Sequence, residues 1–144
     1  MNNWKETTLG KVVDTIIDNR GRNPESYSIE GIPVIDNYLI TGEKAIDLSQ
    51  AKRFIDENTY SSFIRKYSQE GDVLITLVGN GYGNAALSPK ERSVIIQNTI
   101  GLRCKNFADN SFIFYNLSLN KNRITESPTT RIAGGMRKAP KRGQ

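Results

Sequence analysis

The feature that most constrains this fold is a nearly continuous apolar run at residues 73–78, with the sequence VLITLV, in which Thr76 is the one polar residue. A run of this length is typical of a strand buried on both faces, because so many adjacent apolar side chains cannot all be left in water. Gly71 and Gly79 bound the run and mark its ends. The sequence therefore predicts a central strand, whose buried side chains are Val73, Leu74, Ile75 and Leu77.

Shorter segments predict the remaining elements. Extended segments are expected where β-branched residues cluster, at residues 15–18, 32–40, 94–96 and 99–104. Helices are expected after capping residues: Thr7 or Thr8 before 9–13, Asp56 before a helix carrying Tyr60, Phe63, Ile64 and Tyr67, and Asn110 before 112–119. Without regular βαβ alternation, this mixture predicts an α+β fold: a single compact domain with a mixed, largely antiparallel sheet and a few short helices.

The end of the chain differs in amino-acid composition from the rest. Residues 125–144 contain two prolines and three glycines, and we expect one domain at 1–124 followed by a flexible basic tail at 125–144. The formal net charge of +5 comes from this tail, because residues 127–144 hold five basic residues and no acidic one. The remaining 126 residues hold 15 of each sign. A nucleic-acid surface in the domain would therefore require segregated charges.

Several classes of enzyme are excluded by missing residues. The chain has no histidine and one cysteine, Cys104, which excludes a cysteine/histidine zinc site and a histidine base. It lacks the acid-x-Lys triplet of many nucleases and the Asn-Pro-Pro-Tyr/Phe element of adenine methyltransferases. We therefore expect a protein that is not an enzyme, with no catalytic residue, metal or cofactor. No apolar segment predicts a membrane span or a signal peptide, so we expect a cytoplasmic protein.

A glycine-rich loop follows the predicted central strand, at residues 79–84, with the sequence GNGYGN. The dinucleotide-binding fingerprint needs Gly-x-Gly-x-x-Gly and a following helix, but here the spacing is Gly-x-Gly-x-Gly and Pro89 leaves little room for a helix. A structural turn with positive φ at two or three positions is one interpretation. Another is a turn that also brings Asn80, Tyr82 and Asn84 close to a ligand.

Other polar segments carry side chains suited to nucleic acid. Arginine can make two hydrogen bonds to the major-groove edge of guanine, and asparagine or glutamine two to that of adenine. Such side chains occur in a glycine-containing turn and between two extended segments, and paired basic residues suited to phosphate contacts occur at 52–53. The resulting DNA-binding candidates, besides those in the glycine loop, are Arg20, Arg22, Asn23, Lys52, Arg53, Gln97 and Asn98.

The order of several short motifs resembles a known family. These are Trp4, Leu9-Gly10, the turn at 21–24, GIPVI at 31–35, EGDVLIT at 70–76, the loop at 79–83 and the pair QN at 97–98. Across residues 4–124 they resemble the target-recognition domains of the specificity subunits of type I restriction-modification systems. The resemblance implies an α+β DNA-binding module that reads one half of a split site.

The resemblance also implies partners. Double-stranded DNA is the first, and the modification (methyltransferase) subunit, and through it the restriction subunit, is the second. A complete specificity subunit carries two such domains separated by long helices, and this chain stops where the first helix is expected, so a second half-subunit is a further expected partner. Two alternatives stay open: a nucleotide- or S-adenosylmethionine-binding enzyme that uses the loop at 79–83, and a non-specific nucleic-acid binder that uses the basic tail.

The composition of the tail generates a first prediction. Because its prolines, glycines and scattered apolar residues give it no apolar face to pack, deleting residues 127–144 should leave the melting temperature nearly unchanged. Thermal unfolding of the full chain and the shortened chain is the measurement. A loss of more than about 1 kcal/mol, roughly the effect of removing a helix cap, would show that the tail belongs to the fold.

Overall fold

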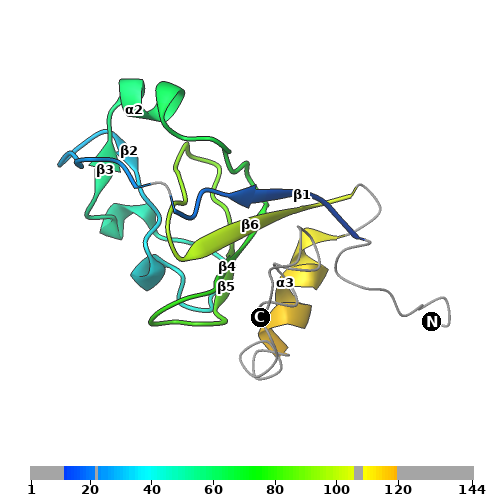
Figure 1. The fold of residues 1–144 in the computed structure, drawn as a ribbon. Coiled ribbons are helices and arrows are strands. Elements are labelled where there is room, and N and C mark those ends of the chain that lie inside the picture. The colour runs from blue at the N-terminus through cyan, green and yellow to red at the C-terminus, as the bar shows by residue number, and fades with distance from the viewer. Residues whose placement is uncertain (1–11, 22, 106–108, 120–144) are drawn as a thin grey trace, which may run out of the picture.

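The computed structural model describes residues 12–21, 23–105 and 109–119, which form an α+β domain around a four-stranded antiparallel sheet (Figure 1). The strand order is β1 (Val13–Asp18), β6 (Thr99–Cys104), β4 (Val73–Thr76) and β5 (Ala85–Leu87). β4 lies between β6 and β5, and all four of its side chains are buried, as is the side chain of Leu77 just after it. The predicted fold class and the predicted central strand are confirmed, although the strand ends at Thr76 and Val78, the last residue of the apolar run, is exposed.

The two faces of the sheet are covered by different parts of the chain. Helix α3 (Asn110–Leu119) lies against one face, where its Ile113 and Leu117 pack on side chains of β4 and β6 (Figure 1). The other face packs against the chain that connects β1 with β4 and against Ile95. This second cluster consists of Ile17, Ile35, Leu39, Ile40, Leu74, Ala86 and Ile95.

A small second sheet extends the domain on the side away from α3. It pairs β2 (Ile32–Pro33) with β3 (Phe54–Ile55), and it is followed by helix α2 (Glu57–Ser62) (Figure 1). Two short 3-10 helices, η1 (Asn37–Leu39) and η2 (Leu48–Gln50), lie between these strands in the sequence. In the described part of the chain, no helix has both the length and the apolar character needed to cross a bilayer.

The strand predicted at residues 32–40 is wrong beyond its beginning. After β2, the backbone N–H groups of Val34 and Ile35 bond to different segments, at the carbonyl oxygens of Arg53 (2.9 Å) and Val94 (2.8 Å). The turn-forming residue Asp36 then starts η1, where Leu39 N–H donates to its carbonyl oxygen at 2.9 Å. Ile35, Leu39 and Ile40 are buried, but they lie in and around a turn rather than in a strand.

The helix predicted from Asp56 to Tyr67 is shorter than expected. Asp56 is the N-cap, since its carboxylate accepts from the Thr59 N–H at 2.8 Å, but the helix ends at Ser62. The hydroxyl of Ser62 bonds back to the carbonyl oxygen of Asn58 at 2.6 Å, a contact that competes with helical hydrogen bonding. Farther along, a buried side chain holds the backbone of residue 66, so the segment cannot continue as a helix.

Three smaller predictions also need correction, and one strand was not predicted. Val13 lies in β1 rather than in the helix predicted at 9–13, while Thr7, Thr8 and residues 9–11 lie outside the described residues. Residues 94–96 are buried but form only an isolated bridge from Val94 to Val34. Asn110 begins α3 instead of capping it, because the cap is the carboxylate of Asp109, which accepts from the Ser111 N–H at 2.8 Å. β5 was not predicted, because Ala-Ala-Leu carries no β-branched residue.

One buried polar side chain joins three segments at the end of β1. Asn19 is 1% exposed, and its amide nitrogen donates to the carbonyl oxygens of Lys66 (2.8 Å) and Ile95 (2.9 Å). Its amide oxygen accepts from the Lys66 N–H at 2.9 Å. All three bonds connect segments that are far apart in the sequence, so this side chain fixes how they meet.

The Asn19 contacts generate a stability prediction. Asn19→Ala leaves a backbone N–H and two carbonyl oxygens without their partner, and each orphaned buried group costs about 1–3 kcal/mol. We expect the free energy of unfolding, measured by urea denaturation, to fall by roughly 3 kcal/mol. The matched control is Asn58→Ala, because the Asn58 side chain is exposed. Equal stabilities for the two variants would contradict the proposed role of the Asn19 amide.

Candidate functional site

Strand directions bring three of the predicted DNA-binding segments to one end of the main sheet. β1 ends with Asp18 opposite Ile100, and β4 ends with Thr76 opposite Thr99. β5 begins at the same end, where Ala85 pairs with Ile75 of β4. Residues 19–21 and 23 after β1, the loop at 77–84 and the pair at 97–98 therefore lie at the same end of the sheet, and we call this surface the loop end.

The glycine loop forms the hairpin connection between β4 and β5. Gly79, Gly81 and Gly83 have φ angles of 88°, 84° and 89°, which side-chain-bearing residues rarely adopt. The interpretation as a turn with several positive φ angles is thus confirmed. Because a strand rather than a helix follows, the loop offers no helix N-terminus to a pyrophosphate, and the cofactor-binding interpretation is not supported.

Neighbouring segments hold the start of this loop in place. The Leu77 N–H donates to the carbonyl oxygen of Asn98 at 2.8 Å, and the side-chain amide of Asn37 donates to the carbonyl oxygen of Val78 at 3.2 Å. Asn98 itself has a φ of 66°, the one positive value among described residues other than glycine. The loop, the pair at 97–98 and helix η1 therefore form one connected surface.

The candidate side chains at this surface differ in how they are engaged. Asn80 is exposed and Gln97 and Asn98 are half-buried, and none of the three side chains makes a hydrogen bond within the described structure. Tyr82 and Asn84 are half-buried, and the Asn84 amide donates to the carbonyl oxygen of Ile40 at 3.2 Å. Asn80, Gln97 and Asn98 thus keep their amide groups available to a ligand.

The turn after β1 presents fewer available groups. The guanidinium of Arg20 donates two hydrogen bonds to the carboxylate of Asp18, at 2.9 and 2.8 Å. Asn23 is exposed, and Arg22 lies outside the described residues. Because β1 is separated from β4 by β6, this turn lies two strand spacings, about 10 Å, from the glycine loop.

The basic pair at 52–53 lies beside η1. Arg53 donates to the carboxylate of Asp36 at 3.0 and 2.5 Å and stacks 4.1 Å from the ring centre of Tyr27. The Asp36 hydrogen bonds raise the pKa of Arg53 further above its already high value. Lys52 is exposed, with its ammonium 5.3 Å from the ring centre of Tyr38. Of the two, Lys52 is the cation left for an anionic ligand.

Two residues of this surface, Asn37 and Tyr38, were not predicted from the sequence. Asn37 supports the glycine loop, and the exposed ring of Tyr38 lies under Lys52. Both were assigned to the strand predicted at 32–40. The signal that could have separated them is the Asp36-Asn37 dipeptide, since both residue types favour turns over strand interiors.

The described residues offer little to chemical catalysis. Burial raises the pKa of the Cys104 thiol, so at neutral pH it stays protonated, and its side chain packs against the core beneath α3. Among residues 12–21, 23–105 and 109–119, no group of three or more acidic or cysteine side chains is placed to hold a metal ion. The side chains that the loop end keeps available are the amides of Asn80, Gln97 and Asn98.

Comparison with solved structures identifies the fold. The chain superimposes on the HsdS subunit from Thermoanaerobacter tengcongensis with a TM-score of 0.65 and 20% identity over 84% of its length. It superimposes on a protein from a study of complex assembly and conformational transition in the type I R-M system with a TM-score of 0.63 and 21% identity over 82%. The S subunit of a type I restriction-modification system from M. genitalium matches with a TM-score of 0.50 and 16% identity over 83%.

These matches cover only part of the larger chains. This chain spans 28% of the first two proteins and 27% of the third. No known family profile matches the sequence, and no curated protein sequence matches it. The shared feature is therefore the fold of one segment of a type I specificity subunit.

The loop geometry generates a prediction with a matched pair of glycines. Gly81 and Gly21 have nearly equal φ angles of 84° and 85°, but a Cβ at Gly81 would lie 3.2 Å from the Asn84 amide nitrogen, whereas one at Gly21 would have nothing within 4 Å. Alanine at either position costs about 1–2 kcal/mol in this left-handed conformation. We expect Gly81→Ala to lose about 1 kcal/mol more in urea denaturation, because it disturbs the hydrogen bond from Asn84 to Ile40. Equal losses would contradict the packing described for the loop.

Proposed function

We propose that this chain is the sequence-specific DNA-binding module of a type I restriction-modification system, reading one half of a split site. The observation that carries the proposal is the loop end, where Asn80, Gln97 and Asn98 keep their side-chain amides available on one connected surface. Asparagine and glutamine amides can form hydrogen bonds to both N6 and N7 of adenine in the major groove. The fold shared with type I specificity subunits supports the same function.

The dimensions of the loop end fit a short DNA site. Four strands at a spacing of about 4.8 Å make the end of the sheet roughly 14 Å wide. That width corresponds to about four base pairs at 3.4 Å each. A module of this size would therefore read a short stretch of sequence and would need a second module to define a longer, split site.

Contacts to phosphates would come from the margins of this surface. Lys52 is exposed beside η1 and is available for such a contact. Arg20 and Arg53 are already bonded to carboxylates, so we assign them to the framework of the site rather than to base contacts. The basic tail at 125–144 would add sequence-independent attraction to the backbone, beyond the domain at 1–124.

The proposed function places catalysis in other subunits. This module would dock with a modification subunit, and through it with a restriction subunit, and a second half-subunit would read the other half of the site. It would act in the cytoplasm as a non-catalytic component. The fold likeness to a protein studied for complex assembly in the type I R-M system supports this arrangement.

The proposal predicts two separable effects on DNA binding. Arg22→Ala, Asn80→Ala and Gln97→Ala should each weaken binding to the preferred duplex by about 1–3 kcal/mol wherever the side chain makes a bidentate base contact. Deleting residues 127–144 should weaken binding to every duplex alike and reduce its salt dependence. Fluorescence titration at several salt concentrations, with preferred and random duplexes, measures both.

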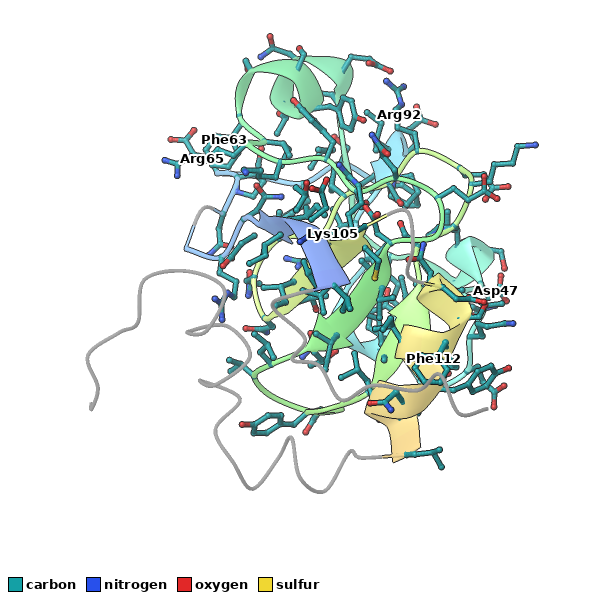
Figure 2. The ribbon with its side chains drawn as sticks, turned by 90° about the vertical axis from the view of Figure 1, so that its right-hand side faces the viewer. Asp47, Phe63, Arg65, Arg92, Lys105 and Phe112 are labelled. Atoms are coloured by element: carbon teal, nitrogen blue, oxygen red, sulfur yellow. The ribbon has the colours of Figure 1, made fainter. Side chains whose placement is uncertain are left out.

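A control residue lies at the far end of the sheet. Lys105 follows β6 at the end opposite the glycine loop and is exposed (Figure 2). Lys105→Ala should leave the preference for the target duplex unchanged. If the three variants instead lose affinity equally for target and random DNA, these side chains do not read bases, and the recognition surface must lie elsewhere.

A further inference from the structure

Val78 is an exposed apolar side chain at the loop end. It is 53% exposed, although the five residues before it in the apolar run are all buried. Among described residues, the other exposed large hydrophobic side chains lie on α3, at Ile29, and at Tyr38 beside the same loop. Val78 belongs to none of the three core clusters, so about half of its apolar surface is available to a partner.

The position of this side chain is fixed before any ligand binds. The carbonyl oxygen of Val78 accepts from the Asn37 amide at 3.2 Å, and the preceding N–H, that of Leu77, is bonded to Asn98. A β-branched side chain also has few χ1 rotamers. Val78 would therefore lose little conformational entropy when it contacts a partner.

The groups around Val78 indicate what that partner is. Asn80 is exposed two residues later, and the amide nitrogen of Asn98 lies 4.0 Å from where a Cβ on the adjacent Gly79 would be. The surface thus presents one apolar branched group beside amide groups that both donate and accept. In the major groove, an A·T pair presents the complementary pattern: the C5-methyl group and O4 of thymine beside N7 and N6 of adenine.

We propose that Val78 is a specificity-determining residue that packs against the C5-methyl group of a thymine in the DNA major groove. The adenine of the same base pair is read by the neighbouring amides. This inference rests on the function proposed above and adds the identity of one base pair in the site. A protein partner covering Val78 would give no sensitivity to this methyl group.

The experiment removes the methyl group and nothing else. The preferred duplex is first selected from a random library with the full chain, and each thymine is then replaced singly by deoxyuridine. Losing one buried methyl contact should weaken binding by the unmodified chain about fourfold at one position. Val78→Ala should bind the thymine and deoxyuridine duplexes equally, while the control Ile29→Ala should keep the fourfold difference.

The outcomes separate this inference from the proposed function. Because Val78 is exposed, Val78→Ala should keep the melting temperature of the unmodified chain, so a loss of methyl sensitivity reports recognition rather than unfolding. A selected site without an A·T pair, no effect of deoxyuridine at any position, or an effect that persists in Val78→Ala would overturn the role of Val78 while leaving sequence-specific binding intact. Failure to select any preferred duplex would overturn the proposed function, and the inference with it.

Discussion

The arrangement of the loop end depends on the buried amide of Asn19. Its three hydrogen bonds join the end of β1 to the segment after α2 and to Ile95, shortly before β6. In water these groups would be hydrated, but inside the domain each needs a protein partner. The same side chain thus stops the predicted helix early and sets where the pair at 97–98 emerges beside the glycine loop.

Carboxylates engage several of the arginines near the sheet. Arg20 pairs with Asp18, Arg53 with Asp36, and Arg103 with the buried Asp72 at 2.9 Å. These pairs agree with the neutral charge of residues 1–126, since positive side chains bonded to acids contribute little field outside the protein. Amide side chains, which carry no net charge, are then the groups at the loop end best suited to distinguishing one base from another.

Sequence patterns predicted the elements that burial alone determines. They failed where contacts between residues distant in the sequence determine the local backbone structure. The apolar run around Leu74 identified the central strand, because most of its side chains must be buried. The departures from the predicted strand after β2 and from the predicted helix after α2 also depend on hydrogen bonds to residues remote in sequence, which a local pattern does not encode. For the candidate site, the glycine spacing predicted a turn with several positive φ angles, whereas the contribution of Asn37 depends on the folded arrangement of η1.

The pairing of β1 with β6 has a consequence for how the domain is made. Val13 lies opposite Cys104, so the first strand of the main sheet pairs with its last strand along the chain. Pairing between strands so far apart in the sequence requires a large loss of loop-closure entropy, and this slows folding. During synthesis on the ribosome, β1 would pair with β6 only after nearly the whole domain had been synthesised. Until then, one edge of the β4–β5 hairpin would stay unpaired. The loop end would therefore take shape only in the last step, so a chain shortened before β6 would keep the glycine loop but not the surface around it.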